Sequence, residues 1–459
     1  VDSALDCLFG YKDCFGVKSQ ACGFLVKVTE MSGEMEEGSE DILKVLYSYG
    51  VVSNSKSLLY ENTGPSPAYF SAIMNLLYNM AVLDTKKISG ICIQLDIWDA
   101  LVRLIRPKAL SERVYTEQRK PCAALCVYSF DEVLYALIAL LDFTVHLMYD
   151  VQIAEYLLES THILAYCNDW LQELADHFDE HKEALHGKAV SSVVTCIHIA
   201  LYKAPKKAIH RLEGFSYGAI SDLLDVVKGL ETRLSILRLT TCLLEEFPIG
   251  EESERIILHL LGFYKEIREK EDPLKEISCA LSCFIYHSES AKNVAILTGF
   301  ANELFEEGKE LIAALQNQEI QKRQTLEDSN IKSCIRLLSI FRFWSAGSTS
   351  AKAQLAITQS VPGPLIKFLF NLWNLTLNKE KLHSSLLQTL ATLISESPEA
   401  KKAMALTQSK QSILGQIIHY VSRPTTAGEN NFWLCLKILG SICSSKEARQ
   451  LLIKTRYPQ

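Results

Sequence analysis

The chain has 459 residues, of which 48% are hydrophobic and 22% are charged, and it contains only 12 Pro and 21 Gly. This balance is typical of an ordered protein and excludes a disordered or collagen-like chain. The net charge is −7 and no clustered basic stripe is present, so we expect no nucleic-acid partner. The apolar stretch from Val133 to Val145 is too short to cross a bilayer and is interrupted by Asp142, so we expect no membrane partner.

Apolar residues at helical spacing recur along nearly the whole chain, whereas segments that alternate with a period of two are few. Leu386, Leu387, Leu390, Leu393 and Ile394 are a clear example of the helical spacing. The pattern predicts an all-α fold made of helix–turn–helix units. We therefore expect an α-solenoid of armadillo/HEAT-like helical repeats.

Four polar or breaker-rich stretches interrupt the helical pattern, and we expect loops there: residues 31–41, 53–67, 107–121 and 316–330. The last stretch follows an amphipathic segment, Asn302 to Gln316, so a projecting helix and a flexible loop both fit it.

A short phrase recurs through the second half of the chain. An apolar run ends in a Ser/Gly-rich break, and a small residue followed by Lys or Arg then opens another apolar run. The phrase occurs at Ala291-Lys292, Ala351-Lys352, Ala400-Lys401 and Ala448-Arg449, and more faintly at Ser253-Glu254-Arg255, Pro205-Lys206-Lys207 and Asp84-Thr85-Lys86-Lys87. The spacing of roughly 50 residues is typical of stacked helical repeats, in which each unit buries its apolar face on the next.

We predict one continuous solenoid with three stretches. Residues 1–130 form N-terminal repeats with irregular loops, residues 131–275 form central repeats, and residues 276–459 form armadillo-like C-terminal repeats.

The sequence contains no P-loop and no GxGxxG motif, which are the usual signatures of phosphate and dinucleotide binding. One candidate metal cluster consists of His177, His181 and His186 with Asp176 and Asp179, because His177 and His181 share a helical face. A solvated polar face explains the same residues, and we prefer that interpretation. We therefore predict no catalytic, cofactor-binding or metal-binding residue, and no enzyme activity.

The 14 Cys residues are scattered and include no CxxC motif. The pairs Cys122/Cys126 and Cys279/Cys283 are four residues apart, which places each pair on one face of a helix. We predict reduced, buried, structural thiols, as in a cytosolic protein.

Two groups of polar residues are candidates for partner binding. A basic group after the apolar run 193–201 either docks an acidic peptide or forms a solvated helix start, which we prefer; its members are Lys203, Lys206, Lys207, His210 and Arg211. Asn residues at i, i+4 spacing occur at Asn75/Asn79 and, beside Trp373, at Asn374/Asn378. Such residues clamp an extended peptide in armadillo repeats, but capping or buried hydrogen bonding fits them equally well.

The stretch from Cys279 to Leu315 is the most distinctive part of the sequence. It contains Leu-Ser-Cys-Phe-Ile-Tyr-His-Ser-Glu-Ser-Ala-Lys-Asn-Val-Ala from position 281, and then Thr298-Gly299-Phe300 before a Glu/Lys-rich helix. Cys334-Ile-Arg-Leu-Leu and Val361-Pro-Gly-Pro-Leu follow in the same order. Over about residues 275–375 the chain resembles the C-terminal region of the rotatin family, armadillo-like proteins of centrioles and basal bodies.

This resemblance implies a non-enzymatic scaffold in centriole assembly and elongation and in basal-body function, located in the cytoplasm at the cytoskeleton, centrosome and cilium. The implied partners are centriole assembly proteins and a protein phosphatase 1 regulatory-subunit-like protein, with no cofactor. The alternatives are another armadillo/HEAT adaptor, such as a transport or phosphatase scaffold, and a metal protein built on the His177 cluster.

Overall fold

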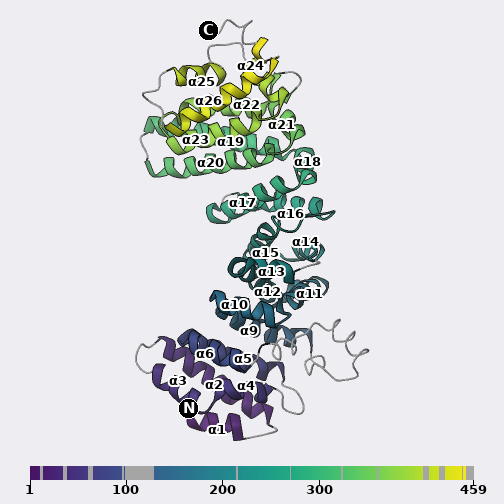
Figure 1. Cartoon of the computed structure of the whole chain (residues 1–459), viewed down its shortest axis with the longest axis vertical. Coiled ribbons are helices and arrows are strands. Elements are labelled where there is room, and N and C mark those ends of the chain that lie inside the picture. Colours follow the sequence, from purple (N-terminus) through teal and green to yellow (C-terminus); the bar gives the residue numbers. More distant parts are fainter. Residues whose placement is uncertain are drawn as a thin grey trace. The chain divides into compact units, whose positions relative to one another are not determined.

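The chain forms two compact units, unit 1 from Val1 to Phe247 and unit 2 from Pro248 to Gln459. The computed structural model describes residues 1–10, 14–34, 39–59, 66–95, 98, 129–212, 215–268, 270–321, 324–358, 361–406, 413–422, 429–446 and 448–450. Within each unit, helices pack side by side in successive layers (Figure 1).

Unit 1 is entirely helical over its described residues. Its helices are α1 (Asp2–Gly10), α2 (Phe15–Glu34), α3 (Ser39–Ser48), α4 (Val51–Leu59), α5 (Pro67–Leu83), α6 (Thr85–Gln94), α9 (Phe130–Met148), α10 (Val151–Ser160), α11 (Ile163–Asp176), the short 3-10 helix η2 (Glu180–Lys182), α12 (Glu183–Lys203), α13 (Pro205–Arg211), α14 (Tyr217–Val226) and α15 (Leu230–Leu243).

Unit 2 is built in the same way, apart from one short pair of strands. Its helices are α16 (Ser253–Glu266), α17 (Glu271–His287), α18 (Glu289–Leu297), α19 (Phe300–Gln321), α20 (Gln324–Ser345), α21 (Thr349–Ala356), α22 (Pro364–Thr376), α23 (Glu380–Ile394), α24 (Pro398–Leu406), α25 (Ile413–Val421) and α26 (Glu429–Ser444). Strands β1 (Ile357–Thr358) and β2 (Val361–Pro362) pair antiparallel between α21 and α22.

Most sets contain three helices, not the two that the helix–turn–helix interpretation predicted; α16–α17 is a set of two. The sets α10–α12, α18–α20 and α21–α23 each end in a helix that packs on the last helix of the next set, and α24–α26 follows with the same order of helices. An extra break divides the first part of each three-helix set; Gly299, with φ +75°, makes this break between α18 and α19. Three helices per repeat are characteristic of armadillo units, so the all-α, armadillo-like solenoid prediction is confirmed.

The last helices of successive sets form one packed row in each unit. Row 1 consists of α2, α5, α9, α12 and α15, and row 2 consists of α17, α20, α23 and α26. The apolar stripe that defined the helical spacing in the sequence is the buried side of α23, where Leu386, Leu390 and Leu393 are fully buried.

Three of the four expected loops are helical over most of their described residues. Within the stretch 31–41, α2 continues to Glu34 and α3 begins at Ser39. Helix α4 extends to Leu59, into the stretch that begins at Ser53, and α19 and α20 together occupy most of residues 316–330, which favours the helix over the flexible loop. The expected loop at 107–121 lies outside the described residues. In the three described stretches, polar residues were assigned to loops, although the exposed face of a helix accommodates them equally well.

One segment, Glu180–Lys203, is long and apolar enough to cross a membrane by length and composition. It comprises η2 and α12, and 67% of its most apolar window is buried by neighbouring helices. A core helix of a helical stack has the same properties, because it is apolar on several faces.

Candidate interaction surface

The recurring small-residue and lysine phrase opens the first helix of each set in unit 2. Ser288, Ser348 and Ser397 are N-caps whose Oγ accepts the backbone N–H three residues later, at 3.1, 3.1 and 3.2 Å. The residue that donates is a buried Ala in each case, where a larger side chain would meet the core. The phrase therefore marks a helix start whose cap and small residue are both needed for packing.

The lysine of each phrase binds the C-terminal end of the next row-2 helix. Lys292 Nζ donates to the Ala346 carbonyl after α20 at 2.9 Å, and Lys352 Nζ donates to the Ser395 carbonyl after α23 at 2.6 Å. Lys401 Nζ reaches Ser444 Oγ at the end of α26 at 3.0 Å. The first two lysines are only 3% exposed, and burial lowers the pKa of Lys352. We call this set the lysine ladder; the sequence revealed its spacing but not its role.

In unit 1 the corresponding contacts are made by carboxylates at helix N-termini. Asp131, in the first turn of α9, accepts from Lys182 Nζ at 2.5 Å and from His186 Nε2 at 3.0 Å. These two hydrogen bonds, the one from Lys182 first, lower the pKa of Asp131. Glu183, the first residue of α12, accepts the backbone N–H groups of Lys228 and Gly229 at the start of α15. We call these contacts the carboxylate ladder.

One of the candidate metal residues, His186, lies in this carboxylate ladder, and the candidates do not come together as a metal site. His186 Nδ1 accepts the Asp179 backbone N–H at 3.1 Å while Nε2 contacts Asp131, so both of its ring nitrogens are bound to protein atoms. His177 caps α11 and lies 3.7 Å from Glu173. Among the described residues, no group of three His, Cys, Asp or Glu side chains is arranged to hold a metal ion.

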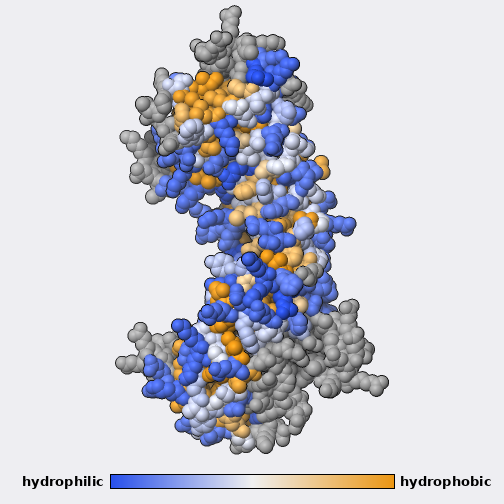
Figure 2. Space-filling view, in the orientation of Figure 1, coloured by the Kyte–Doolittle hydropathy of each residue, from blue (hydrophilic) through white to orange (hydrophobic). Residues whose placement is uncertain are grey.

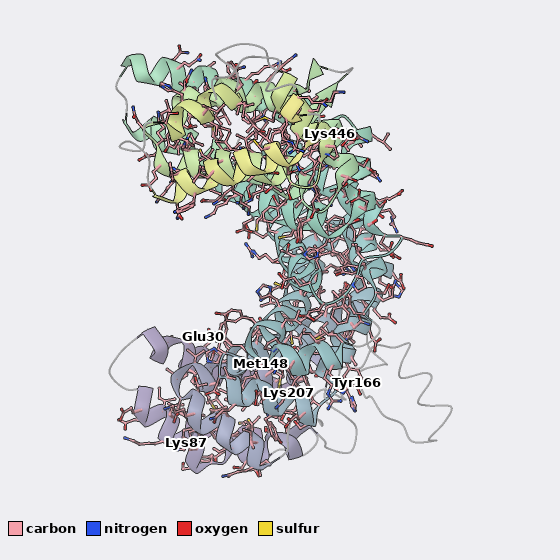
Figure 3. The ribbon with its side chains drawn as sticks, turned by 45° about the horizontal axis from the view of Figure 1, so that its top comes forward. Glu30, Lys87, Met148, Tyr166, Lys207 and Lys446 are labelled. Atoms are coloured by element: carbon pink, nitrogen blue, oxygen red, sulfur yellow. The ribbon has the colours of Figure 1, made fainter. Side chains whose placement is uncertain are left out.

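The basic group 203–211 is largely bound within unit 1. Lys207, whose side chain is labelled in Figure 3, belongs to α13. Its Nζ contacts Glu155 and Glu159 of α10 at 3.2 and 2.6 Å. Arg211 donates to the carbonyls of Leu158 and Glu159 at the end of the same helix, at 2.8 Å each. These contacts support a structural role at a helix start over an acidic-peptide site, as we had preferred.

Of the two Asn pairs, Asn79 takes the hydrogen-bonding role. Asn79 Nδ2 donates to Val26 O at 3.2 Å and to Thr29 Oγ1 at 3.1 Å, which joins α5 to α2. Asn374 and Asn378 are exposed, but Trp373 beside them is 2% exposed and packs edge-on against the His383 ring. Half-buried hydrogen bonding between two helices is therefore the role of Asn79, and the Trp373 ring belongs to the core.

Row 1 instead exposes a group of tyrosines around one lysine. Tyr202 is 72% exposed and Tyr149 is 56% exposed, and Lys203 Nζ lies 5.3 and 5.5 Å from the centres of their rings. Tyr135 lies on α9, the helix that ends just before Tyr149, and is 57% exposed. Large amphipathic rings that remain in solvent beside a cation are typical of partner-binding surfaces.

Row 2 exposes a second aromatic group. Tyr286 of α17 packs edge-on against Phe343 of α20, with ring centres 5.8 Å apart, and Arg342 lies 5.1 Å above the Phe343 ring. Arg342 also donates to Gln388 of α23, which joins three helices of the row. Trp433 of α26 is 61% exposed, and Figure 2 shows hydrophobic residues gathered over α25 and α26. Sequence reasoning missed these residues because an aromatic at helical spacing usually belongs to the core.

The prediction that the cysteines are buried is only partly correct. Cys22, Cys92, Cys167, Cys196, Cys334 and Cys435 are buried, and burial raises the pKa of Cys22, among others. Cys14, Cys242, Cys279 and Cys443 are exposed. The pair Cys122/Cys126 lies outside the described residues. The prediction placed these cysteines on the apolar faces of their helices, but the exposed face of a helix accommodates a small thiol equally well.

Comparison with known proteins supports the fold. No protein-family model matches the chain, and no curated protein matches its sequence. An engineered protein of known structure is 12% identical and aligns over 99% of this chain and 91% of its own, with a TM-score of 0.54. SYS-1 is 12% identical and aligns over 99% of this chain and 85% of its own, with a TM-score of 0.39. A chain from a structure of the cadherin–beta-catenin interaction is also 12% identical and aligns over 98% of this chain and 94% of its own, with a TM-score of 0.47.

The similarity to the engineered protein concerns the fold alone. Together with the three-helix repeats, it places the chain among the armadillo-like all-α solenoids. A stack of this kind presents a broad surface, which suits a protein-interaction scaffold.

Proposed function

We propose that this chain is a non-enzymatic protein-interaction scaffold that acts in centriole assembly and elongation and at the ciliary basal body. Its partners are centriole assembly proteins and a protein phosphatase 1 regulatory-subunit-like protein, and it works at the centrosome and cilium without nucleic acid, membrane or cofactor. The centriolar part of this proposal is supported by the resemblance of residues 275–375 to the rotatin family.

The observation that carries the scaffold role is the exposure of aromatic rings on both rows. Tyr202, Tyr149 and Trp433 are each more than half exposed, and Lys203 and Arg342 lie over neighbouring rings. Tyrosine, tryptophan and arginine dominate the binding free energy of protein interfaces, because a large ring buries much area and loses little side-chain entropy. Exposed rings held on packed helices are pre-organised for a partner.

Proximity labelling with the full chain in cells that build cilia tests this function. Three variants are compared with the wild type: Tyr149→Ser with Tyr202→Ser on row 1, Tyr286→Ser on row 2, and Leu297→Ser as a matched control. Leu297 belongs to α18, outside both rows, and is 84% exposed. Circular dichroism verifies that each variant remains folded.

We expect centriole components to be labelled by the wild type and the control, and to be lost in at least one row variant. If centriole components are labelled no more than by an unrelated solenoid, the centriolar role is wrong. If transport receptors or phosphatase subunits are labelled instead, the chain is one of the other adaptors. If both row variants label as the wild type does, the aromatic groups are not the binding surface.

A further inference from the structure

Three exposed lysines lie at one level across three neighbouring helices of row 2: Lys275 of α17, Lys332 of α20 and Lys381 of α23. The rings of Tyr286 and Phe343, 5.8 Å apart, fix the register of the first two helices. Lys275 and Lys332 each precede this pair by 11 residues (286−275 and 343−332), which is about three turns. Lys332 and Lys381 each lie 13 residues before the last residue of their helix (345−332 and 394−381). We call these three lysines the cationic line.

The cationic line lies on the open face of row 2. Helices α20 and α23 each pack on the row helices to both sides and on other helices of their own set, so one face of each helix remains open (Figure 1). Exposed side chains on neighbouring row helices therefore share one surface. Because packed helices lie about 8–10 Å apart, successive members of the line are spaced by about that distance.

The cationic line has no counter-charge within the part of the chain that the structure describes, where none of its lysines forms an ion pair. Where charged side chains of α16 and α19 meet, opposite charges pair, as Lys265 does with Glu303 at 2.7 Å. Lys381 moreover lies in the first turn of α23, where the helix dipole disfavours a cation. Like charges on adjacent helices repel and do not stabilise the stack, so the line is suited to an anion from outside the chain.

We propose that the cationic line binds an acidic, extended segment of a partner protein that runs across the helices of row 2. A polyproline II segment rises about 3.1 Å per residue with three residues per turn, so Asp or Glu at every third position recurs on one side at about 9 Å. That spacing matches one lysine per helix. A β-strand fits less well, because its side chains recur on one side at about 6.6–6.8 Å. This proposal rests on the scaffold function and names the chemistry of one partner segment.

A nucleic acid is the other polyanion that lysines attract, and the charge of the chain disfavours it. The line offers three cations on a chain of net charge −7. Nucleic-acid-binding proteins make about 6–10 phosphate contacts to reach useful affinity. An acidic protein segment needs only a few charges, since the remaining contacts are made by its other side chains.

Fluorescence anisotropy with the full chain at low salt tests the proposal. The probes are two labelled Pro/Ser-rich peptides of about twelve residues that have the same composition with four Asp. One carries Asp at every third position, and the other carries the four Asp as one block. We expect the spaced peptide to bind about threefold more tightly than the block peptide. Its affinity should fall as NaCl is raised from about 0.05 to about 0.5 M, because salt screens exposed charges.

Substitutions assign the binding to the line. Lys275→Gln, Lys332→Gln and Lys381→Gln should each weaken binding of the spaced peptide by about two- to fivefold, the range of an exposed ion pair, and the triple variant by about tenfold or more. Lys402→Gln is the matched control, because Lys402 is also exposed and forms no ion pair with a described residue, but lies on α24, outside row 2. It should leave the affinity unchanged.

Three results would overturn the proposal. The first is equal binding of the two peptides, and the second is a triple variant that binds the spaced peptide as the wild type does. The third is a single-stranded oligonucleotide of equal charge that binds more tightly than the spaced peptide and is lost in the triple variant. Centriole labelling in cells is a separate measurement, so failure of the cationic line and failure of the proposed function are distinguishable.

Discussion

Charged side chains bind opposite ends of the row helices in the two units. In unit 1, Asp131 and Glu183 lie at helix N-termini and bind Lys182, His186 or backbone N–H groups of the next set. In unit 2, Lys292 and Lys352 lie on the first helix of a set and bind carbonyls at the C-terminus of the last helix of the same set. A carboxylate compensates the positive end of the helix dipole and an ammonium compensates the negative end, so both arrangements are favourable.

The difference teaches that one repeat architecture tolerates either solution. Glu183 satisfies backbone N–H groups, and Lys292 and Lys352 satisfy backbone carbonyls, that the helices themselves cannot. The carboxylate ladder joins one set to the next, whereas the lysine ladder joins the first helix of a set to its last helix. The ladder lysines Lys292 and Lys352 are buried, whereas Asp131 and Glu183 are partly exposed. We therefore expect charge changes in unit 2 to cost more stability than those in unit 1.

The largest effect is expected at Glu307, a buried carboxylate inside unit 2. It is 6% exposed, accepts from Tyr264 Oη at 2.8 Å and pairs with Arg336 of α20. Glu307→Gln leaves the Arg336 charge buried without a counter-charge, which we expect to lower the free energy of unfolding by about 3–5 kcal/mol. Urea denaturation, with hydrogen exchange to assign the change to unit 2, measures it.

Glu310→Gln is the matched control, because the pair of Glu310 with Arg268 at 2.7 Å is exposed. We expect it to cost less than about 1 kcal/mol. Equal losses for the two variants would mean that burial does not set the cost of a charge change in this unit.

A second effect concerns pH and is also specific to unit 2. His383 is 1% exposed, and burial lowers its pKa to about 4. Its Nδ1 donates to Thr376 Oγ1 at 2.7 Å, since the Thr376 hydroxyl itself donates to Trp373 O. Nε2 is buried and has no acceptor among the described residues, so a second proton there would be unpaired.

The unfolded chain therefore takes up this proton first, near pH 6.5, and the folded chain only near pH 4. The free energy of unfolding contributed by His383 is complete above about pH 6.5 and decreases by about 2–3 kcal/mol as the pH falls to about 4. Hydrogen exchange of α22 and α23 across this range measures it. His383→Gln should flatten the dependence, whereas replacing the exposed His287 should not; an unchanged slope in His383→Gln would rule out His383 as its source.

The third effect tests the lysine ladder directly. Lys352→Met keeps the apolar stem but leaves the Ser395 carbonyl without its donor, and we expect a loss of about 1–3 kcal/mol. Lys401→Met is the control, because Lys401 is more exposed and binds a hydroxyl that solvent also reaches; its cost should stay below about 1 kcal/mol. The ladder would have no energetic role if both variants unfolded at the wild-type urea concentration.

The repeats of unit 2 are easier to recognise in the sequence than those of unit 1 because the two ladders constrain residue positions differently. A lysine that must reach a carbonyl from the start of a short helix needs a fixed place after the Ser cap and the buried Ala, so Ala291-Lys292 and Ala351-Lys352 recur as one phrase. A carboxylate at a helix start has more freedom, since Asp131 and Glu183 reach different donors. The repeats of unit 1 were correspondingly faint.

Surface chemistry was less predictable than the fold. Helical spacing separates the buried face from the exposed face only on average. Leu386 and Leu390 were therefore assigned correctly to the core, whereas the exposed Cys279 was assigned to it wrongly and the exposed Tyr202 was not singled out. Nothing local distinguishes an exposed tyrosine from a buried one. The packing of neighbouring sets, which are separated by roughly 50 residues, decides which face remains in solvent.

The smallest effect is expected at the carboxylate ladder. Glu183→Ala removes the acceptor from the Gly229 and Lys228 N–H groups, and we expect a loss of about 1–2 kcal/mol. Glu183→Gln keeps an acceptor oxygen but removes the charge that favours the N-terminus of α15, so its loss should be about 0.5 kcal/mol. Hydrogen exchange in the first turn of α15 should increase in the order wild type, Gln, Ala, with unit 2 unaffected. If the Ala variant exchanged as slowly as the wild type, the carboxylate would not stabilise the start of α15. The carboxylate ladder would then contribute no stability, unlike the lysine ladder.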